Sequence, residues 1–400
     1  LFYLFFELML LPMFFLIGIW GGPRKEYASI KFFLYTLFGS LLILAVMIVL
    51  NISYLDPIKS ASDSLSFINS DIVHGFSFFH LTDQGNILKG SPIESNSISL
   101  FFNWNLRTMA FWALIIGFMI KLPSVPFHTW LPDAHVEAPT PVSIILAALL
   151  LKIGAYGIFR IAAPIFPDIL EMGSEILCII SVISIVYGGL NALAMMDLKK
   201  MIAYSSVSHM GFVLLGLSAF NTEGFIGANV QMLSHGLHSA GLFILAGIVY
   251  RRTGSREIGD YSGLNQVMPI YATLTLLVFL ASMGLPGFSG FIGEIMILIG
   301  AFNAASIGNY SIWLVALAVL GIFISATYFI WTMQRMFFGS LMLKNLSWKN
   351  LLKDLEAYEK YSLIALMLFS AFIGLFSFFM TDMLDINLGS MVEIMNQHID

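Results

Sequence analysis

The sequence predicts an all-α, polytopic membrane protein, and three features of the chain carry that prediction. Hydrophobic residues make up 58% of the 400 positions and charged residues 11%, whereas a soluble domain usually carries roughly 25% charged residues. Uncharged stretches of about 20 residues, the length that crosses a bilayer as a helix, recur along the chain. In the segment from Tyr261 to Gln334, Glu294 is the sole formal charge. A chain of this composition lacks the polar surface that a soluble protein needs.

Ten membrane spans follow from the spacing of the apolar stretches. We expect them at residues 1–20, 32–54, 106–131, 142–163, 175–196, 201–220, 224–250, 268–301, 309–333 and 361–380. Of the 19 Lys and Arg residues, thirteen fall on one set of alternate loops, four on the opposite side and two inside predicted spans. Because cytoplasmic and matrix loops carry an excess of basic residues, the thirteen mark the inner side.

The start of the chain and its two longest loops give weaker signals. The opening run LFYLFFELMLLPMFF has no initiating Met and no basic segment before it, so it resembles neither a signal peptide nor a natural start. We expect a helix whose beginning lies upstream. The outer loop at 53–105 is expected to be partly ordered and to serve as a connector. On the inner side, SWKNLLKDLEAYEK (347–360) predicts a helix lying at the membrane interface.

A single cysteine, Cys178, limits the chemistry of the chain. It excludes an internal disulfide framework, a Cys-ligated zinc site and a Cys-ligated iron–sulfur cluster. Any redox chemistry must therefore take place on a partner, and we expect no cofactor or metal bound by this chain.

Ionisable residues inside the predicted spans are the main candidates for function, because a charge at the bilayer centre costs about 2.5–3.5 kcal/mol on insertion scales. Lys121 lies about 20 Å into its span at about 1.5 Å per residue, shortly before Pro123 and Pro126. The prolines should break the helix there, and broken helices at membrane depth line cavities or binding sites. Glu7 is the candidate partner, and moving its carboxylate would switch the protonation of Lys121. The alternative is a static ion pair that holds two helices together.

Lys152 and Glu294 complete the set of buried charges. Lys152 lies near mid-span, beside Gly154 and Gly157, which permit close helix approach or water entry. Glu294 ends the run GLPGFSGFIGE, whose glycines and proline predict a second interrupted helix. A buried carboxyl group can bind and release a proton near neutral pH. Two interrupted helices, one bearing Lys121 and the other Glu294, are typical of transporters built from repeated halves.

Three histidines, His209, His235 and His238, also fall in predicted spans. Because histidine titrates near neutrality, His209 and His235 suit a relay between Lys152 and Glu294. A neutral, hydrogen-bonded imidazole is the simpler interpretation of any one of them, and His238 is assigned to the core or to a supporting role. His235 and His238 share a helix face at i and i+3, as a metal pair would, but no carboxylate accompanies them.

Five runs of sequence resemble the antiporter-like membrane subunits of respiratory complex I, the NADH:quinone oxidoreductase. They are KLPSVPFHTWLPDAHVEAPTPVS (121–143), LLKIGAYGIFR (150–160), DLKKMIAYSSVSHMGF (197–212), QMLSHGLHSAGLF (231–243) and GLPGFSGFIGE (284–294). The resemblance implies a single membrane domain of 14 helices, in which helices four to eight and nine to thirteen form inverted repeats with the seventh and twelfth broken. The ten spans then correspond to helices five to fourteen, and about four helices are expected upstream. Residues 1–163 would end the first repeat, 175–333 would form the second, and 335–400 would hold the interfacial segment and last helix.

The same resemblance assigns proton-pathway roles to six residues, namely Glu7, Lys121, Lys152, His209, His235 and Glu294. Glu7 matches the glutamate of the fifth helix that pairs with the lysine of the seventh, Lys152 matches the central lysine of the eighth, and the two histidines match the connecting hydrophilic axis. Glu294 matches the terminal acid of the twelfth helix. Subunits L and N typically place a lysine there, so Glu294 favours the subunit M (mitochondrial subunit 4) group. His238 stands where a small polar residue is commoner, and the 53–105 loop is longer than usual.

The resemblance implies an energy-coupled proton translocator, a membrane subunit of a NADH:quinone oxidoreductase without a redox centre of its own. FMN, iron–sulfur clusters and quinone are then expected on other subunits. The expected partners are neighbouring membrane subunits of the L and N types and the lipid bilayer, with no nucleic acid. The bacterial inner membrane is the expected location, with an organelle inner membrane as the alternative. Two other functions stay open: a subunit of a multisubunit cation/proton antiporter without redox coupling, which Glu294 disfavours, and a scaffold with structural ion pairs.

Overall fold

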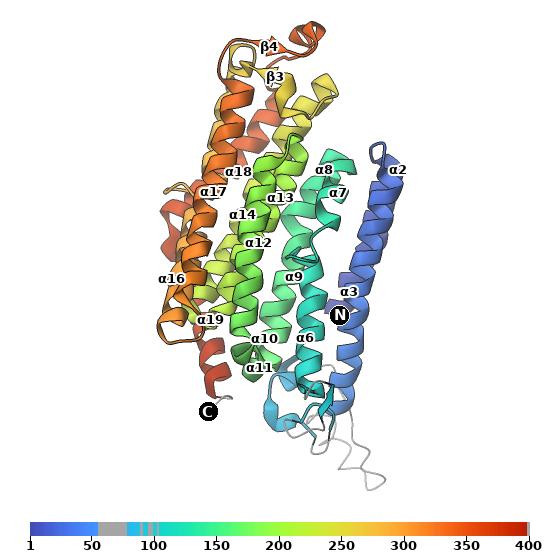
Figure 1. The fold of residues 1–400 in the computed structure, drawn as a ribbon, viewed down its shortest axis with the longest axis vertical. Helices are drawn as coiled ribbons and strands as arrows, with labels where there is room; N and C mark the ends of the chain where they lie inside the picture. Colours follow the sequence, from blue (N-terminus) through green and yellow to red (C-terminus); the bar gives the residue numbers. More distant parts are fainter. Residues whose placement is uncertain (55–77, 89–90, 95–98, 102–103, 398–400) are drawn as a thin grey trace.

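The computed structural model describes residues 1–54, 78–88, 91–94, 99–101 and 104–397. It is a bundle of long helices that run roughly side by side (Figure 1). Nine helices of this described part are long and apolar enough to cross a membrane. A tenth crossing is made by two shorter helices, α6 and α7, within 106–137. The predicted all-α, polytopic fold class is confirmed.

The helices of the first half begin and end as follows: α1 Phe2–Leu8, α2 Leu10–Trp20, α3 Lys25–Ser53, α5 Phe78–Leu81, α6 Leu106–Lys121, α7 Trp130–Glu137, α8 Thr140–Ile145, α9 Leu151–Gly157, α10 Ala163–Ile165, α11 Pro167–Met172 and α12 Ser174–Ala194. Those of the second half are α13 Leu198–Ser218, α14 Thr222–Thr253, α15 Pro269–Ser282, α16 Ser289–Ser306, α17 Ile312–Phe337, α18 Ala357–Leu375 and α19 Ser377–Gln397. Two short strand pairs accompany them, β1 Ser99–Phe101 with β2 Trp104–Asn105 and β3 Tyr261–Ser262 with β4 Met342–Leu343.

Local sequence sets several helix ends. The side chains of Asn105, Asp197 and Asn221 accept hydrogen bonds from backbone amides at the starts of α6, α13 and α14, which satisfies donors that a first helical turn leaves unpaired. Proline occupies the first position of α11 and α15, where its missing amide removes no helical hydrogen bond. Gly254, at φ +74°, ends α14 in the left-handed conformation that glycine adopts without strain.

Burial is greatest in α13, which packs against both α12 and α14 and has nearly every side chain enclosed. The outer helices α3, α17 and α18 instead expose large apolar side chains such as Leu34, Phe323 and Phe372. Lipid tails are as apolar as leucine, so these surfaces suit a bilayer. The polar groups of α13 and α14 are shielded from that lipid by the surrounding helices.

Both predicted helix interruptions are present. Residues 122–129 separate α6 from α7, and residues 283–288 separate α15 from α16. In the second interruption Gly284 and Gly287 have φ angles of 79° and 101°, a region that other residue types rarely adopt. The prolines of 122–129 and the glycines of 283–288 therefore interrupt the helices at the predicted positions.

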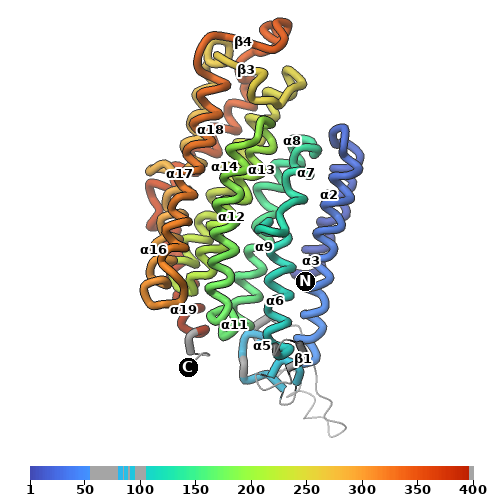
Figure 2. The backbone as a smooth tube through the Cα atoms, in the orientation of Figure 1, coloured from blue at the N-terminus to red at the C-terminus, as the bar shows by residue number. Residues whose placement is uncertain are grey.

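The basic loops gather at one end of the bundle. The connections at 21–24, 254–268 and 338–356 all lie at the upper end in the view of Figure 2. This arrangement agrees with the alternation of basic loops that fixed the predicted orientation.

The C-terminal part differs from the prediction in two ways. The prediction of an interfacial helix over 347–360 is wrong in its first half, because Leu346–Asn350 is a 3₁₀ segment and α18 begins at Ala357. A capping box formed by Glu356 and Glu359 fixes that start. Helix α19 extends well beyond the predicted last span and, like α18, packs along α14. The expectation for the 53–105 loop falls mostly outside the described residues.

Candidate functional site

Lys152 anchors a buried array of polar side chains. It lies in α9, between two π-helical segments, Leu146–Leu150 and Ile158–Ala162. Such segments are rare in helices and occur frequently at functional sites. Lys152 Nζ donates to the carbonyl of Ala147 at 2.6 Å and lies 2.6 Å from His235 Nδ1 on α14. The carbonyl in the first π-helical segment thus helps to hold the lysine against the histidine.

The array continues from His235 to Glu294. The imidazole centroids of His235 and His209 are 5.6 Å apart. His209 Nδ1 lies 3.4 Å from Glu294 Oε1, and Gln231 Nε2 lies 3.4 Å from both of these atoms. The structure therefore brings four of the six predicted site residues together, in the order Lys152, His235, His209, Glu294.

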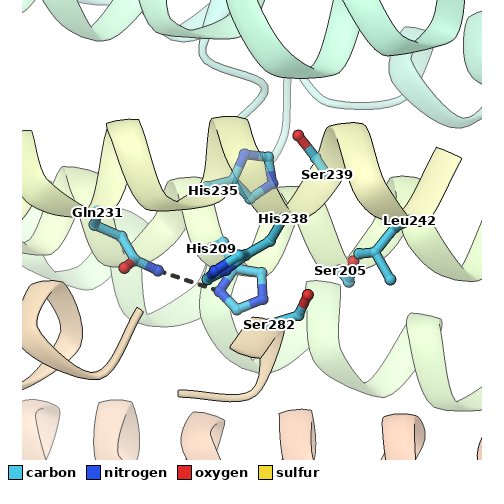
Figure 3. Close-up of a pocket in the computed structure, with 8 residues that line it drawn as sticks. All are labelled: Ser205, His209, Gln231, His235, His238, Ser239, Leu242 and Ser282. Carbon is cyan, nitrogen blue, oxygen red and sulfur yellow. Dashed lines mark hydrogen bonds between the residues drawn. The ribbon is translucent and has the colours of Figure 1, made fainter. Parts of the chain in front are cut away.

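A small cavity lies beside the two histidines (Figure 3). Its volume is about 10 Å³, and it is lined by Ser205, His209, Gln231, His235, His238, Ser239, Leu242 and Ser282. A space of this size holds about one water molecule when polar partners surround it. No hydrogen bond joins His209 to His235 within the described residues, so a water in this cavity would be needed to connect the two imidazoles.

Two glycines, Gly284 in the second interruption and Gly293 in α16, restrict the space around Glu294 and Gln231. A Cβ on Gly284 would lie 2.6 Å from Glu294 Oε2, and a Cβ on Gly293 would lie 2.6 Å from Gln231 Oε1. A side chain at Gly284 would displace the end of the Glu294 side chain, whereas one at Gly293 would also meet the backbone of Gln231 at 2.9 Å. One carboxylate oxygen is therefore packed against the interruption while the other faces Gln231 and His209.

Lys121 is separate from this array. Its side chain is 1% exposed, and Nζ lies 5.0 Å and 5.7 Å from the ring centroids of Phe6 and Phe32, distances at which a cation is attracted to an aromatic face. Within the described residues, Nζ has no hydrogen-bond partner. Glu7 acts on it electrostatically while accepting a hydrogen bond from the Tyr3 hydroxyl at 3.3 Å. The expected partnership of Glu7 and Lys121 is therefore an interaction at longer range than a contact ion pair.

Helix α9 packs directly on the end of α6, beside Lys121. A Cβ on Gly154 would lie 2.7 Å from the backbone nitrogen of Leu122, and one on Gly157 would lie 2.2 Å from the ring of Phe118. The predicted close helix approach at these glycines is confirmed. It places the helix of Lys152 against the helix of Lys121.

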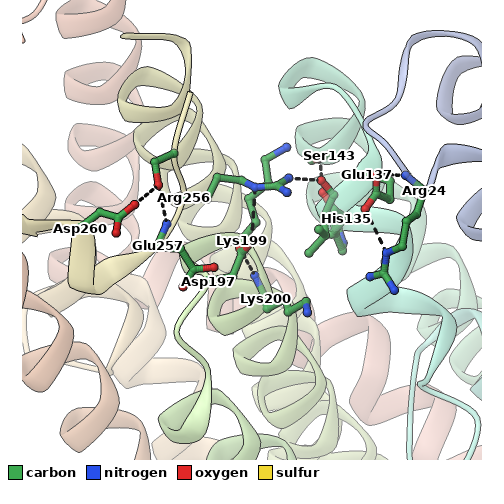
Figure 4. A network of polar contacts seen from close by, with 12 residues as sticks. Arg24, His135, Glu137, Ser143, Asp197, Lys199, Lys200, Arg256, Glu257 and Asp260 are labelled. Atoms are coloured by element: carbon green, nitrogen blue, oxygen red, sulfur yellow. Dashed lines mark hydrogen bonds and ion pairs between the residues drawn. The ribbon is translucent and has the colours of Figure 1, made fainter. Parts of the chain in front are cut away.

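Sequence reasoning missed a second polar network near the basic end of the bundle (Figure 4). Lys199 is 2% exposed, and its Nζ donates to the carbonyl of Ala138 at 2.8 Å. His135 is wholly buried and stacks on Phe243 with ring centroids 4.5 Å apart. Both of its ring nitrogens lack a hydrogen-bond partner in the described part of the chain. Arg256 pairs with Asp197 at 3.3 Å and donates to the carbonyl of Val136, which ties the loop after α14 to α7.

The sequence carried a partial signal for this network. His135 and Ala138 lie inside the 121–143 run, but nothing local distinguishes a buried histidine from an exposed one. Lys199 and Lys200 were both assigned to an inner loop, yet they lie in the first turn of α13, and only Lys199 turns inward. Gln231 was missed because the search for functional residues in the spans considered charged and titratable side chains, and an amide is neither.

The two histidines of α14 engage different partners. His235 faces Lys152, whereas His238 Nε2 lies 2.7 Å from Ser370 Oγ. Over the described ranges of the chain, no group of three or more His, Cys, Asp or Glu side chains could hold a metal ion. Their i, i+3 spacing therefore places these histidines on one helix face without making them converge.

Comparison with known proteins identifies the family of the chain. A family model described as "NADH:quinone oxidoreductase/Mrp antiporter, TM" matches residues 1–325. The chain is 38% identical to the NADH-quinone oxidoreductase subunit M of Rhodobacter capsulatus, over 100% of this chain and 72% of that protein. It is 40% identical to the subunit M of Rickettsia bellii (94% and 67%) and 39% identical to the NADH-ubiquinone oxidoreductase chain 4 of Chondrus crispus (94% and 68%).

Solved structures give the same result. A chain of respiratory complex I from Thermus thermophilus superimposes with a TM-score of 0.77 at 31% identity, covering 98% of this chain and 74% of that one. A chain of the Mrp complex from Dietzia sp. has a TM-score of 0.76 at 19% identity, covering 100% and 74%, which shows a shared fold alone. The fold and the buried array thus define a multi-pass membrane subunit of the antiporter-like class. Within that class, the chain belongs to the NADH:quinone oxidoreductase subunit M (chain 4) family.

Proposed function

We propose that this chain translocates protons as a membrane subunit of a NADH:quinone oxidoreductase, and that the array from Lys152 to Glu294 is its proton path. The observation that carries the proposal is the continuity of titratable groups through the bundle interior. Lys152 contacts His235, and His209 contacts Glu294, with a water-sized cavity beside the imidazole pair. Burying ionisable groups in a membrane bundle costs free energy, so the groups found there usually serve a function such as proton transfer.

The geometry supplies each transfer step with a donor and an acceptor. The ammonium of Lys152 can pass a proton to His235 Nδ1 over 2.6 Å. The imidazole of His235 then releases a proton to a water in the cavity, which passes one to His209. From His209 Nδ1 the carboxylate of Glu294 lies 3.4 Å away. Because an imidazole can gain a proton on one nitrogen and release one from the other, a single transfer needs no ring movement. Each imidazole must return to its starting tautomer before the next transfer.

Lys121 acts in this scheme as a gate rather than as a link. A change in the distance between Glu7 and Lys121 alters how firmly Lys121 holds its proton. The charge on Lys121 then acts on the neighbouring helix that carries Lys152, against which it is packed through Gly154. Quinone reduction elsewhere in the complex would drive that change.

The redox chemistry belongs to other subunits in this proposal. Cys178 is buried and stands alone, so FMN, iron–sulfur clusters and quinone would be bound elsewhere in the complex. Neighbouring membrane subunits of the L and N types are the proposed partners. The protein is integral and multi-pass, and its relatives in Rhodobacter and Rickettsia point to a bacterial inner membrane.

The arrangement of broken helices supports the proposed internal repeat. In each half a broken helix, α6–α7 or α15–α16, is followed by a continuous span, Thr140–Ile165 or α17. We infer that residues 1–163 close the first repeat, that 175–333 form the second, and that 335–400 add the last helical segment.

Glu294→Gln in the full-length chain, assembled in its complex in membrane vesicles, tests the function. Glu223→Gln is the matched control, because Glu223 is an exposed carboxylate at the start of α14. We expect E294Q to assemble but to lose NADH:quinone turnover and proton pumping together, while E223Q keeps both. Normal pumping by assembled E294Q would contradict the proposal. A loss of assembly with normal pumping by the complex that does form would favour a scaffold, and cation-driven proton exchange without NADH oxidation would favour an antiporter.

A further inference from the structure

His238 belongs to a closed ring of four hydrogen-bonded side chains that the proton path does not use. His238 Nε2 lies 2.7 Å from Ser370 Oγ, and Ser370 Oγ lies 2.9 Å from Ser289 Oγ. Ser289 Oγ donates to Ser234 Oγ at 2.9 Å, and Ser234 Oγ lies 3.4 Å from His238 Nδ1. All four side chains are buried. His238 also lines the cavity beside His209 and His235, so the ring adjoins the proposed proton path.

The hydrogen bonds of the ring run in one direction. One assignment lets every hydroxyl donate within the ring: Ser289 donates to Ser234, and Ser234 donates to Nδ1 of a neutral His238. His238 Nε2–H in turn donates to Ser370, and Ser370 donates to Ser289. Each donor is used once. In this arrangement a proton added to His238 Nδ1 would point at the hydroxyl hydrogen of Ser234 and break that hydrogen bond. The ring is therefore suited to holding helices together and unsuited to carrying a proton.

The ring joins three helices at the second interruption. Ser234 and His238 lie on α14, Ser289 is the first residue of α16, and Ser370 lies on α18. One turn beyond Ser370, a Cβ on Gly374 would lie 2.5 Å from the carbonyl oxygen of Gly287. Helix α18 thus contacts the interruption twice, once through the ring and once through direct backbone packing.

The start of α16 determines where Glu294 lies. Ser289 precedes Glu294 by five residues in the same continuous helix, so a shift or rotation of that helix end moves the carboxylate. His238 also covers Gly290, where a Cβ would lie 3.3 Å from His238 Cε1. His209 Nδ1 and Glu294 Oε1 are 3.4 Å apart, near the limit of a hydrogen bond, so a small shift of α16 away from His209 would break their contact.

We propose that His238 is a positioning residue: the ring of His238, Ser370, Ser289 and Ser234 clamps the broken helix α15–α16 to α14 and α18 and so sets the distance between Glu294 and His209. This inference rests on the proposed function, in which Glu294 carries the proton. A small polar residue in place of His238 would be too short to reach Ser370 across the interface. The clamp therefore ties the last helical segment to the proton path.

The test uses His238→Leu, which removes the ring, and His238→Gln, which keeps one donor and one acceptor. Ser370→Ala breaks the ring from α18, and Ser362→Ala on the same helix is its control, because within the described residues Ser362 Oγ donates only to the carbonyl of Glu359 in its own helix. We expect H238L and S370A in assembled complex to lower proton pumping about threefold to tenfold. H238Q should recover part of that loss, and S362A should behave as the unmodified protein. In an E294Q background, H238L should cause no further loss.

Infrared spectroscopy supplies a readout that does not depend on pumping. The carboxyl stretching band of Glu294 is identified by its absence in E294Q, and H238L and S370A should shift it while S362A leaves it in place. An unshifted band in H238L and S370A would overturn the proposal, whatever their activity. If E294Q itself pumps normally, the proposed function fails, but a shifted band in S370A would still establish the clamp. If H238L does not assemble, S370A decides the question alone.

Discussion

Substituting Gly284 with alanine should disable the proton path without replacing any proton-carrying group. A Cβ at this position would lie 2.6 Å from Glu294 Oε2, whereas ordinary contact begins at 3.4 Å, so the carboxylate must retreat by about 0.8 Å. The opposite oxygen is 3.4 Å from His209 Nδ1, near the limit of a hydrogen bond. A displacement on the order of 1 Å can reduce a rate about 10²-fold. We therefore expect G284A to retain roughly 1–10% of proton pumping.

Gly287→Ala is the matched control for this prediction. Gly284 and Gly287 both have positive φ, at 79° and 101°, so either alanine costs roughly 1–3 kcal/mol of backbone strain. A Cβ on Gly287, however, meets no atom within 4 Å. NADH-driven proton uptake should be measured in vesicles, per assembled complex, for both variants. G287A should keep more than about half of the activity, by the same reasoning from displacement. Equal losses in the two variants would refute the argument, because strain alone would then explain them.

Three further predictions concern the remaining buried groups. Lys152→Met should abolish the first proton transfer and reduce NADH:quinone turnover about 10²-fold or more. Lys353→Met, at an exposed lysine on the inner side, is the control and should leave turnover unchanged. Turnover is measured per assembled complex for both variants. Lys121→Ala should reduce turnover and pumping together, and an assembled K121A complex that pumps normally would show that Lys121 is structural. Gly157→Val should destabilise the protein by about 1–3 kcal/mol, since a Cβ there would lie 2.2 Å from the Phe118 ring; a thermal unfolding midpoint equal to that of the parent protein would contradict the packing.

The spans and the two interruptions were predictable because their signals are local in the sequence. A run of about 20 apolar residues has few folds available to it in a bilayer. Pro123 and Pro126 in the first interruption, and Gly284 and Gly287 in the second, act on their own backbone. The predicted spans and both breaks could therefore be placed from sequence, with boundaries that differ from the observed helix ends by up to about seven residues.

The contacts within the site were less accessible to sequence reasoning. The residue types of Lys152, His209, His235 and Glu294 marked them as candidates, but their order along one array depends on how α9, α13, α14 and α16 pack. The longer-range relation of Glu7 to Lys121 has the same origin, because it depends on the aromatic rings of Phe6 and Phe32 that surround the lysine.

Other features left almost no trace in the sequence. The π-helical segments around Lys152 have ordinary helical composition, and their geometry is set by packing. Helix α19 carries Asp382 and Asp385 among its apolar residues, which concealed its length. The prediction of an interfacial helix was wrong because Asp354 accepts hydrogen bonds from the backbone amides of Ile270 and Tyr271 at the start of α15. This long-range capping contact holds the segment before α18 in a non-helical form.

The most direct test of the central claim is proton pumping by a His235→Phe complex. His235 is the link that contacts Lys152 and faces the cavity toward His209. Phenylalanine preserves the volume of the ring but cannot carry a proton. The measurement is NADH-driven proton uptake by vesicles, normalised to assembled complex. We expect uptake and NADH:quinone turnover to fall together to below roughly a tenth of their normal values. Undiminished uptake by assembled H235F would show that the proton does not pass through this array.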